Sequence, residues 1–219
     1  MPARDALFHT KLSFVERRRD DRFVTTYRAA RIITARGQEQ LGIVRNVSGG
    51  GVMIETHAGV AVGDRIWLEP RACQPVWGTV VWSEKLRHGV AFDQELPGAS
   101  LLTISTADAP DQVARAPRVT IDMEARLFAA GIWRTVQLCD LSQGGAKIDC
   151  PVILAEAQPA VLAINGLGDV QAFVRWQRDG KLGLLFAEPL SIGMLSAWIA
   201  TQGPPGDATD VLGPPENYV

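Results

Sequence analysis

The sequence contains two copies of one pattern, related by a constant offset of 94 positions. The segment 46–51 (NVSGGG) aligns with 140–145 (DLSQGG), and the same offset relates several distinctive residues further along the chain. These pairs are Trp82 with Trp176, Gly89 with Gly183, Phe92 with Phe186 and Leu96 with Leu190. An offset of this length is the size of a small domain, so it indicates a duplicated domain rather than a solenoid of short repeats.

Each copy alternates short β-prone segments with turn residues. Turn signals about every 8–12 residues favour a small antiparallel barrel or sandwich, and Asn165-Gly166 is typical of a hairpin turn. We therefore predict a mainly all-β protein made of two tandem small antiparallel β-barrels. The expected strands are 27–35, 40–47, 51–56, 65–69, 76–83 and 88–92 in the first copy, and 125–130, 133–141, 145–149, 160–164, 170–177 and 181–186 in the second.

A short helix is expected to follow each barrel. The segment 98–105 is a weak candidate because it is short and rich in β-branched residues. The segment 190–201 is a better one, since it places four apolar residues on one face. These residues are Leu190, Met194, Leu195 and Trp198.

Composition along the chain predicts the domain boundaries. An Ala-, Asp- and Pro-rich stretch predicts a linker at 106–117, and the Gly- and Pro-rich end predicts a disordered tail at 203–219. The two domains are then expected at 16–105 and 118–202. A flexible N-terminal arm at 1–25, which carries a run of arginines, leads into the first domain.

Charge and cysteine usage exclude several classes of function. The net charge is −2, with +2 in residues 1–110 and −4 in residues 111–219, so no global basic field would attract nucleic acid. The three cysteines form no CxxC pair and indicate free thiols rather than disulfides or a metal site. The sequence shows no signal peptide and no long apolar run. We expect a cytoplasmic protein without membrane insertion and without a cofactor.

Catalytic motifs are also absent from the sequence. The three histidines have no HExxH or triad-like context, and neither Ser48 nor Ser142 lies in a G-x-S-x-G elbow. The glycines after Ser48 are not followed by Lys-Ser or Lys-Thr, which excludes a P-loop. Most of the six tryptophans are expected in the barrel cores. The sequence therefore favours a binding protein over an enzyme.

Two polar motifs in the first copy point to a ligand. Arg18 and Arg22 are four residues apart, and Asn46, Ser48 and Gly51 follow as N-x-S-x-x-G. A guanidinium binds phosphate through two parallel hydrogen bonds and stacks on flat π systems, while glycines let backbone N–H groups approach a ligand. The motifs together predict a site for an anionic, purine-bearing ligand. Weaker candidates flank them: Arg17, Arg19, Gly49 and Gly50.

These motifs resemble those of the PilZ family, the bacterial receptor domains for cyclic di-GMP, whose pattern is RxxxR followed by [D/N]xSxxG. The match is complete in the first copy. The resemblance implies that Arg18 and Arg22 pair with phosphates and stack on guanine, while Asn46 and Ser48 hydrogen-bond to guanine edges or phosphate. It further implies that Gly51 permits a turn that a Cβ would block, and that the arm folds over the ligand, often an intercalated dimer.

The second copy keeps the turn motif but lacks the arginine pair. Its turn retains Asp140, Ser142 and Gly145, whereas position 114, four residues before Arg118, is alanine. Arg115 lies three residues from Arg118 instead of four. We expect a degenerate domain with a structural or partner-binding role. The alternative is loose ligand binding through Arg118, Asp140 and Ser142.

The chain carries no recognisable catalytic, receiver or DNA-binding domain, so a signal would pass through contact with a protein target. The predicted mechanism is ligand-induced ordering of the arm at 1–25. The alternative is a tandem barrel that binds no ligand and serves as a protein–protein interaction module. A nucleic-acid-binding barrel is disfavoured by the net charge, and an enzyme acting on cyclic dinucleotides by the missing acid–base and metal residues.

Overall fold

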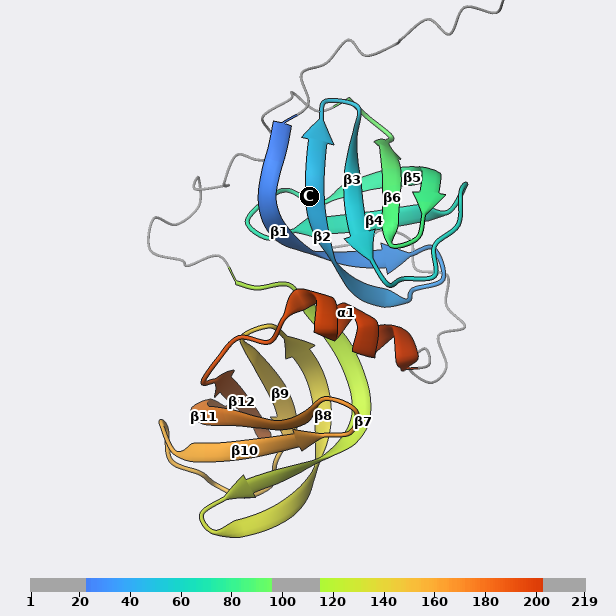
Figure 1. The fold of residues 1–219 in the computed structure, drawn as a ribbon. Coiled ribbons are helices and arrows are strands. Elements are labelled where there is room, and N and C mark those ends of the chain that lie inside the picture. Colours follow the sequence, from blue (N-terminus) through green and yellow to red (C-terminus); the bar gives the residue numbers. More distant parts are fainter. Residues whose placement is uncertain (1–22, 96–114, 203–219) are drawn as a thin grey trace, which may run out of the picture.

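The computed structural model describes residues 23–95 and 115–202, with side chains from residue 28 onward. Within these ranges the chain forms two closed six-stranded antiparallel β-barrels with one short helix, α1, between them (Figure 1). The mainly all-β tandem-barrel prediction is therefore confirmed. The expected linker at 106–117 and the expected helix at 98–105 lie largely or wholly outside the described residues, as does the tail at 203–219.

The first barrel closes in the strand order β1-β2-β3-β6-β5-β4. Inward-facing residues alternate with outward-facing ones along most strands, as in β4, so each strand buries one face in the barrel. Twelve of the buried apolar side chains form its core, including Ile32, Ile54, Ile66 and Leu68. The strands are β1 (Phe23–Thr34), β2 (Glu39–Ser48), β3 (Gly51–Thr56), β4 (Arg65–Pro70), β5 (Val76–Glu84) and β6 (Arg87–Phe92).

The second barrel repeats this topology in the order β10-β11-β12-β9-β8-β7. Its core cluster includes Leu127, Leu138, Ile148, Leu162 and Leu182. All twelve expected strands are present, most of them one to three residues longer than predicted. The strands are β7 (Arg118–Ala129), β8 (Ile132–Ser142), β9 (Gly145–Asp149), β10 (Pro159–Ile164), β11 (Gly168–Arg178) and β12 (Lys181–Phe186).

The start of β7 differs most from the prediction. Arg118 lies seven residues before the first strand expected in this barrel, 125–130, but it is the first residue of β7 and pairs with Ser142. Alternating buried and exposed positions, with Val119 and Ile121 buried, extend the strand seven residues before the predicted start. Residues 119–125 alternate between apolar and polar as in a half-buried strand, so the sequence did contain a signal for this extension.

Three of the six tryptophans contradict the expectation that most lie in the cores. Trp82, Trp133 and Trp176 are each about 40% exposed, at 41%, 40% and 43%. Trp198 on α1 is buried as expected. Core packing therefore does not explain these three tryptophans. Trp82 and Trp176 lie on the outer faces of the two barrels, and Trp133 lies near one end of the second.

Helix α1 (Ile192–Thr201) confirms the expected C-terminal helix and joins the two barrels. Leu195, Trp198 and Ile199 pack into the core of the second barrel, whereas Met194 is exposed, contrary to the prediction. The buried hydroxyl of Ser196 faces the first barrel instead. The helix is thus buried on two sides, which a one-sided apolar pattern could not reveal.

Direct contacts across the interface hold the barrels together. The backbone N–H of His57 donates to Ser196 Oγ at 3.0 Å, and the N–H of Thr120 donates to Glu39 Oε2 at 2.6 Å. Leu41 of β2 is fully buried within the core cluster of the second barrel. The strands β2 and β3 therefore carry the interface at one end and the N-x-S-x-x-G turn at the other. Of the helices described, none has the length and apolarity needed to cross a membrane.

Candidate ligand site

The N-x-S-x-x-G motif forms the tight β2–β3 turn of the first barrel. Ser48 pairs with Gly51, and the Ser48 hydroxyl donates to the Gly51 carbonyl oxygen at 3.3 Å. The backbone N–H of Phe92 donates to the Gly50 carbonyl oxygen at 3.0 Å, which ties the turn to the end of β6. The turn is therefore fixed by the barrel itself and presents its side chains at the surface.

Gly51 is required by a close approach of two strands. A Cβ on Gly51 would overlap the Val90 carbonyl oxygen of β6, whereas a Cβ on Gly50 would meet no atom within 4 Å. The backbone of Gly51 is not in the left-handed region. A Cβ is thus excluded at this position, as the family resemblance implied, but by the neighbouring strand rather than by the conformation of the turn.

Strand register places four residues in one row across the outer face of the first barrel. Asn46 lies opposite Met53, Met53 opposite Gly89, and Gly89 opposite Trp82. Residues directly opposite each other point to the same face. The register shifts just before Asn46 on β2 and just before Trp82 on β5. Such bulges re-aim side chains, and here they flank the row on both sides.

Trp82 covers the backbone of Gly89. A Cβ on Gly89 would overlap atoms of the five-membered indole ring of Trp82, so only glycine lets the ring lie against β6. The same side chain remains 41% exposed. An indole supported on one side and open on the other provides a platform on which a planar group can stack.

The turn and this platform line one hollow of about 220 Å³. Its walls come from β2, β3, β5 and β6, and include Asn46, Ser48, Gly51, Met53, Trp82 and Ala91. None of its lining residues is charged. Drug-sized ligands occupy pockets of roughly 300–1,000 Å³. The hollow is smaller than this range, with polar groups at one edge and an aromatic ring at the other.

Four of the residues expected at the site are thus brought together: Asn46, Ser48, Gly50 and Gly51. Gly49 lies in the same turn. The expected arginines, Arg17, Arg18, Arg19 and Arg22, lie outside the described residues. Sequence reasoning missed Met53, Trp82 and Gly89 as site residues. The repeat did contain a signal, since Trp82 and Gly89 recur at the offset of 94 as Trp176 and Gly183.

The second barrel has the same row with different chemistry. Asp140 lies opposite Lys147, Lys147 opposite Gly183, and Gly183 opposite Trp176. Trp176 covers Gly183 as Trp82 covers Gly89. The second barrel therefore keeps the tryptophan platform, but Asp140 and Lys147 stand where the first barrel has the uncharged Asn46 and Met53.

Ion pairs occupy the turn of the second barrel. Asp140 accepts from Arg118 Nη1 at 2.6 Å and lies 2.8 Å from Lys147 Nζ. Ser142 is buried and donates to the Gly145 carbonyl oxygen at 3.1 Å. The Gln143 side chain donates to the Leu190 carbonyl oxygen at 3.1 Å, just before α1. Polar groups that could meet a ligand are thus satisfied within the barrel.

The pKa is raised for two of the cysteine thiols, Cys73 and Cys139. Burial raises the pKa of Cys73, although the nearby Arg28 guanidinium opposes that shift. Burial, followed by Asp149, raises the pKa of Cys139, with Lys181 opposing. Both thiols stay protonated at neutral pH, and the thiolate is the reactive form. Within 23–95 and 115–202, no group of three or more His, Cys, Asp or Glu side chains is placed to hold a metal ion.

Comparisons with solved structures find distant likenesses. The chain matches Borreliella burgdorferi PlzA in complex with c-di-GMP with 13% identity and a TM-score of 0.36, over 84% of this chain and 94% of that one. It matches the Bacillus subtilis inhibitor of motility (MotI/DgrA) with 11% identity and a TM-score of 0.33, over 81% and 95%. It also matches K. pneumonia MrkH in complex with c-di-GMP with 15% identity and a TM-score of 0.28, over 73% and 78%.

A search of the curated proteins finds no match. The model of the PilZ domain matches residues 16–106 and again residues 112–200. Each match contains one complete barrel together with its N-x-S-x-x-G or D-x-S-x-x-G turn. The two matches together cover most of the chain, which therefore belongs to the PilZ domain family, with one PilZ domain in each barrel.

Proposed function

We propose that the chain is a receptor for cyclic di-GMP, with the ligand bound on the first barrel, and that it passes the signal to a protein target. PilZ domains are non-catalytic receptors of this nucleotide. The observation that carries the proposal is the row on the first barrel. It places the uncharged polar turn of Asn46 and Ser48 and the open indole of Trp82 around one hollow.

The register of β1 connects the arginine motif to this hollow. Phe23 pairs with Val47 and Val24 pairs with Asn46, so β1 begins beside the turn. Arg22 directly precedes Phe23 in the chain. In the proposed complex Arg22 would lie one residue before β1 and so beside the turn, and Arg18 would follow, since an extended chain covers about 3.3 Å per residue. No equivalent arginine pair precedes β7.

The ligand chemistry divides among these groups. Arg18 and Arg22 would bind the phosphates through charge-assisted hydrogen bonds. The exposed face of Trp82 would stack on a guanine. Ser48 already donates its hydroxyl proton to Gly51, so its lone pairs are available to accept from a guanine N–H. Asn46, on the same side, can both donate and accept.

The size of the hollow supports a role for the arm. At about 220 Å³ it is smaller than a site for a cyclic dinucleotide needs. Residues 1–25 would complete it by folding over the bound ligand, and their ordering would create a surface that a target recognises. Because cyclic di-GMP is an intracellular messenger, the proposed receptor would act in the cytoplasm.

The second barrel would be a structural and partner-binding domain. Its Asp140 carboxylate pairs with both Arg118 and Lys147, so a phosphate would share these cations with a carboxylate. Repulsion between that carboxylate and the phosphate would oppose binding there. We therefore assign one ligand site, on the first barrel, to each chain.

Calorimetric titration of the full chain with cyclic di-GMP tests the proposal. We expect saturable binding that Arg22→Ala abolishes or strongly weakens and that Arg118→Ala leaves unchanged. GMP and cyclic di-AMP serve as ligand controls. The absence of binding, or equal loss in Arg118→Ala, would overturn the assignment and favour a tandem interaction module.

A further inference from the structure

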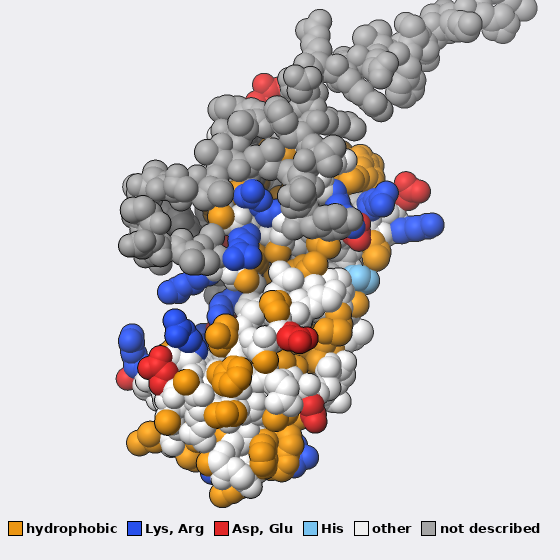
Figure 2. Space-filling view, turned by 60° about the vertical axis from the view of Figure 1, so that its left-hand side comes forward, with side chains coloured by type: hydrophobic (Ala, Val, Ile, Leu, Met, Phe, Trp, Pro, Cys, Tyr) orange, Lys and Arg blue, Asp and Glu red, His pale blue; other side chains and the backbone are white. Residues whose placement is uncertain are grey.

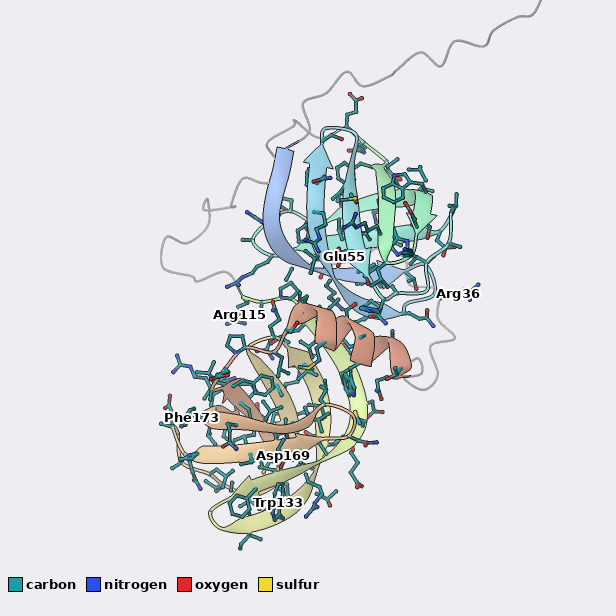
Figure 3. All side chains as sticks on the ribbon, in the orientation of Figure 1. Arg36, Glu55, Arg115, Trp133, Asp169 and Phe173 are labelled. Atoms are coloured by element: carbon teal, nitrogen blue, oxygen red, sulfur yellow. The ribbon has the colours of Figure 1, made fainter. Side chains whose placement is uncertain are left out.

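The end of the second barrel that points away from the first exposes large apolar side chains. Ile153 is 90% exposed, Ile132 56% and Trp133 40%. Ile132 and Trp133 begin β8, and Ile153 lies in the loop after β9. Figure 3 shows Trp133 at the end of the barrel opposite α1, and Figure 2 shows apolar side chains distributed over this part of the surface. Contiguous exposed apolar surface often marks an interaction site.

The equivalent end of the first barrel, found through the sequence repeat, is covered by α1. At the offset of 94, Ile132, Trp133 and Ile153 correspond to Gln38, Glu39 and Gly59. Those three residues line one hollow together with Ile199, Ala200 and Gln202 from the end of α1. In the first barrel, therefore, a helix from the next domain lies against the end that the second barrel leaves open.

The equivalent positions are polar or glycine in the first barrel and apolar in the second. In the first barrel Glu39 forms an ion pair with Arg31 and accepts from Thr120 across the interface. By strand register, Arg31 corresponds to Arg126, since these two lie opposite Leu41 and Thr135. Arg126 instead covers the ring of Trp133, with its guanidinium carbon 4.7 Å from the ring centroid. The ion-paired position has become a cation–π pair at an open surface.

We propose that this end of the second barrel binds an amphipathic helix of a partner protein, one with acidic residues beside its apolar stripe. The helix is indicated by α1, which covers the equivalent end of the first barrel. The acidic residues are indicated by charge beside Trp133, where the segment 126–134 contains Arg126 and Arg134 and no carboxylate, whereas Glu156 and Asp179 lie on the side of Ile153. The α1 helix of a second copy cannot fill this role, because it is buried between its own barrels.

This end of the second barrel would be the surface that contacts the protein target of the proposed function, and binding there does not depend on the nucleotide. Its test uses the full chain with a photo-crosslinking amino acid at position 132 or 153, expressed in cells. The crosslinked partner segment is mapped by mass spectrometry and then made as a synthetic peptide. Binding of that peptide is measured with and without cyclic di-GMP, so that failure of the nucleotide site and failure of this surface are seen separately.

We expect the mapped segment to gain helical circular dichroism on binding the full chain. Ile153→Glu and Trp133→Ala should each weaken peptide binding about tenfold or more. Leu185→Glu is the matched control, since Leu185 is 49% exposed on a different face. Unchanged melting of Ile153→Glu would show that the fold is intact.

Three results would overturn the inference. The first is crosslinking to another copy of this chain, accompanied by self-association in light scattering that Ile153→Glu abolishes. The second is a mapped segment that binds without becoming helical. The third is peptide binding that Leu185→Glu weakens as much as Ile153→Glu and Trp133→Ala do.

Discussion

The indole of Trp82 covers the backbone of Gly89 on the neighbouring strand, in space that any side chain at position 89 would fill. Trp176 and Gly183 repeat this arrangement in the second barrel. The two platforms differ in what lies beside them: Asn46 in the first barrel is replaced by an ion-paired Asp140 in the second. The chain therefore contains its own matched control for a stacking site.

Trp82→Ala is expected to weaken cyclic di-GMP binding by about 1–3 kcal/mol, the usual contribution of one base stacked on an aromatic side chain. Trp176→Ala removes the equivalent ring of the second barrel and should leave the affinity unchanged. Calorimetry on both full-length variants makes the comparison. Equal losses in the two variants would place the ligand elsewhere.

Gly89→Ala should reproduce part of this effect without removing the indole. The added Cβ would push the ring off β6 and tilt the platform. Gly50→Ala, in open space on the same turn, is the control and should have little effect. Tryptophan fluorescence of the Gly89→Ala protein, compared with that of Trp82→Ala, would show whether the ring has moved.

The arginine motif gives a further prediction. Arg18→Ala or Arg22→Ala should each cost about 2–4 kcal/mol of binding, because each removes a charge-assisted contact that is partly shielded from water. Arg22→Lys should restore only part of it, since an ammonium neither forks nor stacks as a guanidinium does. Titration of all three variants measures these differences. Full rescue by lysine would mean that the arginines act only as point charges.

Much of the fold could be predicted because the same pattern of strands and turns occurs in both copies of the repeat. Strands β3 and β12 begin and end where the glycine turns and apolar alternation place them. The start of β7 was missed although residues 119–125 alternate between apolar and polar, a strand signal that the prediction did not use. The interface could not be predicted from the sequence. Ser196 of α1 is buried because the first barrel packs against it, and no local pattern in the helix indicates that contact.

The site was predictable as a turn but not as a surface. A spacing motif identifies Asn46 and Ser48 because they are close in the sequence. The platform comes from β5 and β6, and its place beside the turn follows from register shifts on β2 and β5. The sequence analysis expected most tryptophans in the cores, so the exposed ring of Trp82 became evident only in the structure.

The ion pairs of the second barrel give a prediction about stability. Asp140→Asn should lower the free energy of unfolding by about 1 kcal/mol, a value limited by solvent screening because Arg118 and Lys147 are partly exposed. The loss should shrink as salt rises. Urea unfolding at low and high salt measures it, with Asn46→Ala as the control without an ion pair. A salt-independent loss would mean that packing, not charge, holds this turn.

Burial of His88 gives a pH dependence. Desolvation lowers the pKa of His88 below its ordinary value of 6.5, opposed by the Thr56 backbone. Between the two values the unfolded chain binds the proton more tightly than the folded one. The contribution of His88 to stability is therefore complete above about pH 6.5 and is lost as the pH falls below it.

Thermal unfolding between pH 7.5 and 5.5 tests this, with His88→Leu as the comparison. The melting temperature of the natural chain should fall more steeply on acidification than that of His88→Leu, because His9 and His57 are present in both. Parallel curves would show that His88 carries none of the pH dependence.

The last prediction concerns residues 1–25. Four arginines at 17–19 and 22 repel one another when they are brought close, and a ligand with two phosphates would relieve that repulsion. Cyclic di-GMP should therefore slow hydrogen exchange across residues 10–25 and protect the bonds after Arg17 to Arg22 from trypsin, while strands β7 to β12 exchange as before. Higher salt should reduce this protection, because part of the attraction is screened. Arg18→Ala at saturating ligand should show less protection than the natural chain. If exchange across residues 10–25 is identical with and without saturating ligand, the signal must instead travel along β2 and β3, from the Ser48 turn to the Ser196 contact at their opposite end.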